Sequence, residues 1–392
     1  MIDFRSYWWP LATTHAIHHT RPLARTLLDT PLVLFKDEVG SIAILHDRCP
    51  HRHAPLSEGK VHRGQLACPY HGWQFNGQGH CTKIPGMETS RSIPGIVPTV
   101  ATRVHDGIVW ACLAPSTTPS LTQHTINTSH TPSTSHTPNT PSALSTSHTR
   151  TAAVIDDTNE PATTESHRPP DALHATWLPG MPPLPVTTDM FWMTDHIHCT
   201  LADAAENFLD GFHTHFVHAG WVRHDTQRQQ VTVEIRRIHQ GIEARYSDEN
   251  VQSGIISRFF EGDRTESFGR FRLPGIAEIE YRGQKGLNLI ITAWLTPADT
   301  GSIYVHARIA TRKGHIPAWL KAWVLQRLFR RVLKQDKQIL ETTQRNQERF
   351  KQLGAHSPFL STPLDFLGPS IRLLLTGSAL SADVERTITA QI

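Results

Sequence analysis

The hydrophobic residues of the first 114 positions come in short runs that turn residues separate. Residues 32–36 (LVLFK) and 42–45 (IAIL) flank a turn at 37–40, a pattern typical of a β-hairpin. Asn76-Gly77 is a second hairpin signal. Residues 108–112 (IVWAC) predict a closing strand. We therefore expect a small domain of strands over residues 1–114.

The hydrophobic pattern stops between residues 115 and 170. The sequence Thr-Ser-His-Thr-Pro occurs at 128–132 and again at 134–138, and a partial third copy lies at 146–149. The tract contains no aromatic residue, and no charged residue before Arg150. Such a segment cannot bury enough apolar surface to offset the entropy of ordering it. The composition predicts a disordered linker or insertion over residues 115–170.

The remaining residues, 171–392, show a mixed pattern that predicts an α+β domain. Residues 203–218 look helical, and a long helix is expected from about Pro317 to about Gly354. Between these helices, Gly, Pro and Asp turns separate six strand-like segments, which suggests an antiparallel sheet. The segments are 230–235, 242–246, 268–273, 276–281, 287–295 and 303–310. The tail beyond residue 354 gives no clear pattern.

Length, charge and cysteine content narrow the class of protein. The chain has 392 residues, enough for two ordinary domains, and a formal net charge of +3, which gives no argument for nucleic-acid or membrane binding. Five cysteines are a poor disulfide framework. The N-terminus lacks the pattern of a signal peptide, and no run of about eighteen apolar residues suggests a membrane span. These features predict a cytoplasmic protein with free thiols.

Two short motifs place thiols and imidazoles in alternation. Cys49-Pro-His51 is followed, sixteen residues later, by Cys68-Pro-Tyr-His71. In a Rieske [2Fe–2S] centre two cysteines hold one iron and two histidines hold the other. A structural zinc site is the alternative, but it usually pairs like ligands. We favour the cluster, and interpret the other cysteines as small buried apolar residues. These are Cys81, Cys112 and Cys199.

A second group of ligand types lies in the segment 206–218. Asn207, Asp210 and His213 are spaced i, i+3 and i+6, so they would share one helix face. His218 is five residues beyond His213, about 140° round an ideal helix, so both can face one ion only if the helix ends or bends between them. Two histidines and a carboxylate hold non-haem Fe(II) with coordination positions left open. A polar helix face without a metal is the alternative interpretation.

The third ligand is expected on the late helix. Asp336 lies in the middle of an apolar stripe, and an unpaired carboxylate on a buried face is costly unless it pairs or binds a metal. An ion pair with Lys334 or Lys337 is the alternative, although both project to other sides of the helix. We therefore predict a triad of His213, His218 and Asp336, and interpret His215 as a supporting or structural residue.

With these motifs in this order, the chain resembles the oxygenase component of the Rieske non-haem iron oxygenases. Within that family it looks most like the single-subunit type, such as dicamba monooxygenase and vanillate O-demethylase. The resemblance covers residues 1–114 and about 185–350. It implies a Rieske β-domain joined to a helix-grip catalytic domain with a curved antiparallel sheet. The spacer at 115–170 departs from the family pattern.

The resemblance also implies the roles of individual residues. Asp210 would connect His213 to a cluster ligand, His71, of a neighbouring subunit in a homotrimer, and Asn207 would sit near the iron without binding it. Trp73 would pack near the cluster. The cluster ligands would be Cys49, His51, Cys68 and His71, and the ligands of the mononuclear iron His213, His218 and Asp336.

The reaction implied by the resemblance uses O₂ and electrons from NAD(P)H. A separate reductase, with or without a ferredoxin, would supply the electrons, because the chain has no evident Gly-rich dinucleotide fingerprint. The expected products arise by hydroxylation or by O- or N-demethylation of an aromatic or alicyclic small molecule. Dihydroxylation of a ring in cis is an alternative chemistry. A Rieske electron-transfer or ligand-sensing protein without mononuclear iron is an alternative of another class, and a zinc-stabilised interaction protein is a third.

The substrate pocket is the part that the sequence defines least. Aromatic residues near the expected iron site are candidates for its lining, although each could equally belong to an ordinary core. The candidates are Phe208, Phe212, Phe259, Phe260, Phe268, Trp294 and Trp323.

Overall fold

The computed structural model describes residues 2–87, 95–114, 184, 188–223, 229–247, 264–355 and 358–391. The described residues belong to one compact unit, which takes in residues from both sides of the gap between 114 and 184. The predicted disordered tract at 115–170 lies outside the described residues. Within the described residues, no helix is both long and apolar enough to cross a membrane.

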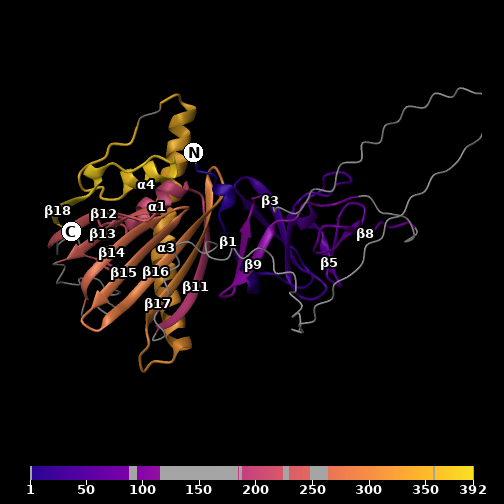
Figure 1. Ribbon diagram of the computed structural model, residues 1–392, viewed down its shortest axis with the longest axis horizontal. Coiled ribbons are helices and arrows are strands. Elements are labelled where there is room, and N and C mark those ends of the chain that lie inside the picture. The colour runs from indigo at the N-terminus through magenta and orange to yellow at the C-terminus, as the bar shows by residue number, and fades with distance from the viewer. Residues whose placement is uncertain are drawn as a thin grey trace, which may run out of the picture. The chain divides into compact units, whose positions relative to one another are not determined.

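The N-terminal residues form three small antiparallel sheets, of order β1-β10-β9, β2-β3-β4 and β5-β6-β7-β8 (Figure 1). The two predicted hairpins are present as β3–β4 and β7–β8, and the predicted closing strand is β10. The bounds are β1 Trp9–Thr13, β2 Leu23–Leu27, β3 Thr30–Lys36, β4 Ile42–His46, β5 Lys60–His62, β6 Gln65–Ala67, β7 Gln74–Phe75, β8 Cys81–Lys83, β9 Ala101–His105 and β10 Ile108–Cys112. Short 3₁₀ turns are η1 Phe4–Ser6, η2 Thr14–Ala16 and η3 Leu56–Glu58.

Strand β3 explains how this part of the chain supports two cores. Leu32 and Leu34 point into one buried cluster, whereas Val33 and Phe35 point into another. Successive side chains of a strand alternate between its faces, so an uninterrupted apolar run fits a strand covered on both sides. The second cluster also contains Cys49 and Cys68, so the two cysteine loops rest on a packed core.

The C-terminal residues build one eight-stranded antiparallel sheet of order β11-β17-β16-β15-β14-β13-β12-β18. Each of the six predicted segments is a strand, whereas β11 and β18, one at each edge, were not predicted. The bounds are β11 Thr188–Ile197, β12 Gln230–Ile238, β13 Gly241–Ser247, β14 Arg264–Arg272, β15 Ile276–Gly283, β16 Gly286–Asp299, β17 Ser302–Arg312 and β18 Arg386–Gln391. The α+β class is confirmed.

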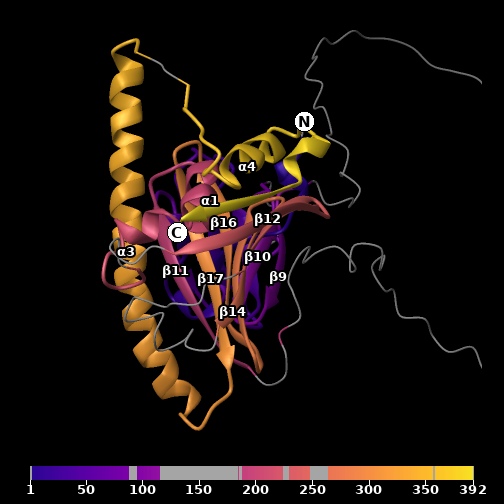
Figure 2. The same ribbon diagram turned by 90° about the vertical axis from the view of Figure 1, so that its left-hand side faces the viewer.

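The long helix α3 (Ala318–Gln352) lies along one face of this sheet, as Figure 2 shows. Its Phe329 and Leu333 pack against Met193, Leu289 and Ile309 of the sheet. Two lysines of α3 also contact the edge strand β11, since the Lys321 Nζ lies 2.6 Å from an Asp189 oxygen and the Lys337 Nζ 2.9 Å from an Asp195 oxygen. The helix is thereby held in one position along the strand.

The helix predicted at 203–218 is wrong beyond Leu209. Helix α1 runs Leu201–Leu209, and Asp210 caps it in an extended conformation (ψ 124°). The Asp210 carboxylate accepts hydrogen bonds from the backbone N–H groups of Phe212 (2.7 Å) and His213 (3.1 Å). An aspartate side chain that accepts hydrogen bonds from the backbone of the next residues competes with the hydrogen bonds of a helix. The glycine at 211, which has a low helix propensity, also favours the break. A short 3₁₀ turn, η5 (His213–His215), follows.

The tail covers α1. Helix α4 (Gly368–Leu375) lies on α1, and the Arg372 guanidinium reaches the carboxylates of Asp203 and Glu206. A Cβ at Gly368 would overlap the Glu206 carboxylate in its present position, so a larger residue here would require the Glu206 side chain to move. A last 3₁₀ turn, η6 (Ala382–Val384), leads into β18.

Candidate functional site

Two closed backbone loops carry the Cys-x-His and Cys-x-x-His motifs. In the first loop the His53 N–H donates to the Cys49 carbonyl (2.8 Å), and in the second the Gly72 N–H donates to the Cys68 carbonyl (3.1 Å). Gly72 has φ +71°, a left-handed conformation that glycine adopts without strain. The backbone therefore fixes the position of each cysteine relative to the histidine that follows it.

The four side chains of these motifs form one cluster. Cys49 and Cys68 are buried, and the rings of His51 and His71 have centroids 4.6 Å apart. The His51 ring stacks on Trp73 at 4.8 Å with an interplanar angle of 8°, so Trp73 packs against one of the predicted cluster ligands. Among the described residues, the buried His51 Nδ1 has no hydrogen-bond partner. Two thiols, two imidazoles and an unused buried ring nitrogen fit the donor set of a Rieske cluster.

The protonation states of this cluster follow from its burial. Desolvation, together with the nearby Cys68, raises the pKa of Cys49 to about 11. Desolvation and the neighbouring His71 and Arg52 lower the pKa of His51, so its imidazole is neutral at physiological pH. Since metal ligands must be thiolates and neutral imidazoles, loading of a cluster would displace the Cys49 proton.

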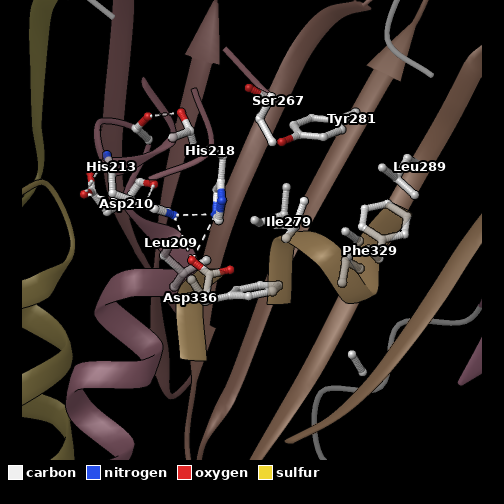
Figure 3. A pocket seen from close by; sticks show the side chains of 18 of the residues that line it. Leu209, Asp210, His213, His218, Ser267, Ile279, Tyr281, Leu289, Phe329 and Asp336 are labelled. Atoms are coloured by element: carbon white, nitrogen blue, oxygen red, sulfur yellow. Dashed lines mark hydrogen bonds and ion pairs between the residues drawn. The ribbon is translucent and has the colours of Figure 1, made fainter. Parts of the chain in front are cut away.

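Three side chains predicted as ligands meet at a second place, shown in Figure 3. The Nε2 atoms of His213 and His218 lie 3.3 Å apart, and the Asp336 Oδ1 lies 3.4 Å from the former and 2.9 Å from the latter. Ligands about 2.1 Å from one ion and at right angles to one another would be about 3 Å apart. The three atoms therefore fit one face of a six-coordinate ion and would leave the opposite face open.

Hydrogen bonds at the other ring nitrogen orient both imidazoles. The His213 Nδ1 lies 2.8 Å from the Asp210 carbonyl oxygen, and the His218 Nδ1 lies 3.0 Å from the Gln335 Oε1. Both oxygens accept, so each Nδ1 is the donor and each Nε2 is left to face Asp336. Such outer partners fix the tautomer and ring orientation of histidines that bind metals.

The electrostatics of the triad favour a bound cation. Burial alone would lower the pKa of His213, but Asp210 and Asp336 outweigh it and raise the pKa to about 9. Burial would raise the pKa of Asp336, and its contacts with His213 and His218 lower it instead. In the metal-free protein the site therefore holds a carboxylate and a proton, and a metal cation could replace that proton.

The break after α1 brings the two histidines together. If residues 213–218 were helical, the side chains of His213 and His218 would point in different directions. The sequence therefore required the helix to end or bend between these two residues. Arg223 holds the turn that follows the helix, since its Nη1 donates to the Gly211 carbonyl (3.0 Å) and to the Thr214 Oγ1 (3.3 Å). The segment that follows α1 and the helix α3 thus supply ligands that are more than a hundred residues apart in the sequence.

Two other predicted residues are not among those that line the cavity described below. Asn207 is partly buried on α1, and His215 is buried in η5. The alternative pairing of Asp336 with a lysine is wrong for Lys337, which contacts Asp195 and, at 4.0 Å, Glu341. Lys334 is exposed.

A cavity of about 190 Å³ opens beside the triad. Alternate residues of the sheet strands and the buried side of α3 supply a mostly apolar wall, while Ser267 and Tyr281 bring hydroxyl groups to one side (Figure 3). Gly269 also lines the cavity, and a Cβ at this position would make ordinary van der Waals contacts, with its nearest neighbours at 3.7 Å. The apolar lining includes Met193, Phe208, Leu209, Phe268, Ile279, Leu289, Ile291, Val305, Ile309, Phe329, Val332 and Leu333.

The aromatic residues predicted for the pocket are divided by the structure. Phe208 and Phe268 line the cavity. Phe212 packs against Phe366 instead, with ring centroids 5.7 Å apart. Trp294 lies in a separate buried cluster beside Trp110, and Trp323 is 52% exposed. The candidates at 259 and 260 lie outside the described residues.

The contacts that Gln335, Ser267 and Tyr281 make at the site were not predicted from the sequence. Gln335 adjoins Asp336, but neighbouring positions on a helix point in different directions, so adjacency alone did not suggest that it contacts His218. Ser267 and Tyr281 sit on two paired strands, Ser267 opposite Tyr281, and only the strand register brings their side chains together. The alternation of side chains in 264–272 is the signal that could have indicated which of them face inward.

Comparison with known proteins agrees with this arrangement. The Rieske [2Fe-2S] domain matches residues 7–101, and the vanillate O-demethylase oxygenase C-terminal domain matches residues 197–367. The crystal structure of dicamba monooxygenase bound to dicamba superimposes with a TM-score of 0.66 over 96% of this chain and 98% of that chain, at 19% sequence identity. At that identity the likeness shows a shared fold.

Two curated relatives are similar over the N-terminal part. The oxygenase component of dicamba O-demethylase from Stenotrophomonas maltophilia is 40% identical over 110 residues, which is 28% of this chain and 32% of the relative. The chloroplastic protein TIC 55 from Arabidopsis thaliana is 42% identical over 120 residues, which is 30% of this chain and 22% of the relative. The alignments thus span no more than about a third of either relative. Taken with the two domain matches, they show that the chain combines a Rieske [2Fe-2S] domain with a C-terminal domain of the vanillate O-demethylase oxygenase type.

Proposed function

We propose that the chain is the oxygenase component of a multi-component oxygenase that acts on an apolar small molecule. The observation that carries the proposal is the triad: three ligand atoms lie within 4.8 Å of one another, next to an apolar cavity. A pure electron carrier needs neither the triad nor the cavity. A ligand sensor would need the cavity alone.

In this proposal the two sites hold different metal groups. Cys49, His51, Cys68 and His71 hold a [2Fe–2S] cluster, and His213, His218 and Asp336 hold a mononuclear Fe(II). Bound iron supplies O₂ activation and the cluster supplies electrons one at a time. The chain itself supplies position, electrostatics and exclusion of water.

The residues around the triad have separate tasks. Asp210 holds the His213 ring through its carbonyl, and Gln335 holds the His218 ring, so both Nε2 atoms stay directed at the ion. The apolar wall positions the substrate beside the open face of that ion and keeps bulk water away. Ser267 and Tyr281 offer hydrogen bonds to one polar group of the substrate, which would orient it within the cavity.

The cavity favours a compact substrate of one or two rings, mainly apolar and with few polar groups, in line with an aromatic or alicyclic compound. We propose hydroxylation or O- or N-demethylation as the reaction. Insertion of both atoms of O₂ into one product molecule would instead identify cis-dihydroxylation.

We also propose two kinds of partner, an electron donor and further copies of the chain. A separate NAD(P)H-dependent reductase, with or without a ferredoxin, reduces the cluster, and the active assembly is a ring of three chains. The Asp210 side chain is 36% exposed although two backbone N–H groups bond it, so it remains accessible to a neighbouring subunit's His71. Three buried free thiols and an iron–sulfur cluster on the other two cysteines fit a reducing compartment such as the cytoplasm.

The test is iron content and turnover of an Asp336→Asn variant against a matched control. Glu348→Gln removes the same charge from an exposed position of the same helix. With a reductase and a panel of single-ring aromatic methyl ethers, the wild-type protein and the control should consume O₂ and form product, whereas Asp336→Asn should keep the cluster and lose both. Equal turnover in all three proteins would refute the assigned triad.

A further inference from the structure

The first half of α3 carries an exposed face that the proposed oxygenase reaction does not use. At its start Trp319, Ile316 and Trp323 are 72%, 56% and 52% exposed, and Leu320 and Val324 are also exposed. Single exposed apolar residues are ordinary, but five within nine positions form a contiguous patch, which marks an interaction surface.

Basic residues continue this patch along the helix. Arg327, Arg330, Arg331 and Lys334 are all exposed, and the Arg327 guanidinium lies 3.7 Å from the centre of the Trp323 ring. Positions 319, 320, 323, 327, 330, 331 and 334 lie on one side of an ideal helix, opposite the buried Leu325 and the inward-facing Phe329, and Ile316 lies just before the helix begins. We call this set of residues, with Val324, the basic aromatic face.

All charged side chains of the basic aromatic face are positive. No aspartate or glutamate occurs between Asp299 and Asp336, whereas four exposed basic side chains lie on two turns of α3. The net charge of the whole chain is only +3, so this segment is a local concentration of positive charge. The partner that fits it is therefore anionic.

We propose that the basic aromatic face binds the surface of a membrane that contains anionic phospholipid. Tryptophan prefers the boundary between headgroups and acyl chains, and basic residues beside it attract anionic headgroups. A two-fold contact between copies of the chain fits less well, because it would bring arginines against arginines, and contact with a different surface of the next chain in a ring is an outcome that the light-scattering test below separates. The face would lie on the bilayer surface and would not span it.

Bilayer binding would bring apolar molecules dissolved in the membrane to the protein. The same helix that carries the face also supplies Phe329, Val332 and Leu333 to the cavity wall. An enzyme with a mostly apolar cavity gains substrate concentration from such a surface, since apolar compounds partition into lipid. The proposal stands on the face itself, and it does not depend on the oxygenase activity.

The experiment is co-sedimentation of the full-length protein with vesicles of phosphatidylcholine alone and of phosphatidylcholine with about one-third phosphatidylglycerol, at low and high salt. We expect binding to the anionic vesicles that salt weakens. A Trp319→Ser, Trp323→Ser double variant should bind at least about tenfold more weakly. An Arg330→Gln, Arg331→Gln variant should bind about fivefold more weakly for each charge removed.

A matched control removes exposed apolar residues elsewhere. Leu353 and Leu360 are 71% and 94% exposed, so a Leu353→Ser, Leu360→Ser variant should bind as the wild-type protein does. Three outcomes would overturn the proposal: no binding to anionic vesicles at low salt, equal binding by both variants and the control, or a lower molar mass of the tryptophan variant in light scattering. The last result would assign the face to contact between copies of the chain.

Discussion

Metal uptake at the triad should depend steeply on pH. In the metal-free protein the pKa of His213 is about 9, because Asp210 and Asp336 outweigh the effect of burial. A metal ion binds only the unprotonated ring, so it must displace this proton at neutral pH. The perturbation that tests this coupling is a change of pH from 6 to 8 during reloading of metal-free protein.

The size of the pH effect on metal affinity follows from how far the pH lies below the pKa of His213. Below a pKa of about 9, the fraction of unprotonated His213 falls about tenfold for each pH unit. The apparent affinity for the metal should therefore rise about 100-fold between pH 6 and pH 8, with about one proton released for each ion bound. The pKa of Asp336 is lowered, so its carboxylate is already ionised throughout this range and adds no further slope.

Anaerobic calorimetry with Co(II) measures both quantities, and repetition in two buffers of different ionisation enthalpy gives the number of protons. An Asp210→Asn variant keeps the three ligands but loses a carboxylate that raises the pKa of His213, so its affinity should change less between pH 6 and pH 8. Equal affinity of the wild-type protein at both pH values, without proton release, would refute this reasoning. The metal-free protein should also lose stability as the pH rises through about 9, since His213 binds its proton more tightly when folded.

Three further variants test particular contacts. Gln335→Leu removes the acceptor of the His218 Nδ1–H and should lower metal affinity about 10- to 100-fold in the same calorimetric titration, while Gln335→Glu should restore most of it. Leu325→Ala leaves a cavity at a fully buried position on α3 and should lower the free energy of unfolding by about 2–5 kcal/mol, measured by urea denaturation. Gly269→Leu should fill part of the cavity and raise the KM for the bulkier of two substrates with an unchanged iron content; unchanged KM values would argue against substrate binding there.

The sequence predicted the parts of the fold that repeat a simple pattern. Strands β12 to β17 and the helix α3 have regular apolar periodicity and clear turn residues at their ends, and all were found. Strand β18 is mostly exposed and polar, so nothing in its own residues distinguishes it from a loop, and only pairing with β12 makes it a strand. Strand β11 was missed for a related reason, since its burial depends on α3 and β17.

The site was predictable where a single residue contradicts its surroundings. Asp336 is a carboxylate within an apolar stripe, and the structure places it against His213 and His218. The sequence required the helix to end or bend between His213 and His218, whereas it ends earlier, after Leu209, because helix propensity does not show where an aspartate side chain takes over backbone hydrogen bonds. The pocket could not be predicted, since an aromatic residue such as Trp294 or Phe208 gives no sign of which strand face it occupies.

The most direct test of the account is the iron and acid-labile sulfide content of anaerobically purified protein, with the electron paramagnetic resonance spectrum of the reduced form. We expect about three irons and two sulfides per chain and a Rieske-type signal. About two irons and two sulfides, unchanged after reconstitution with Fe(II), would leave the cluster in place and contradict a mononuclear iron at His213, His218 and Asp336.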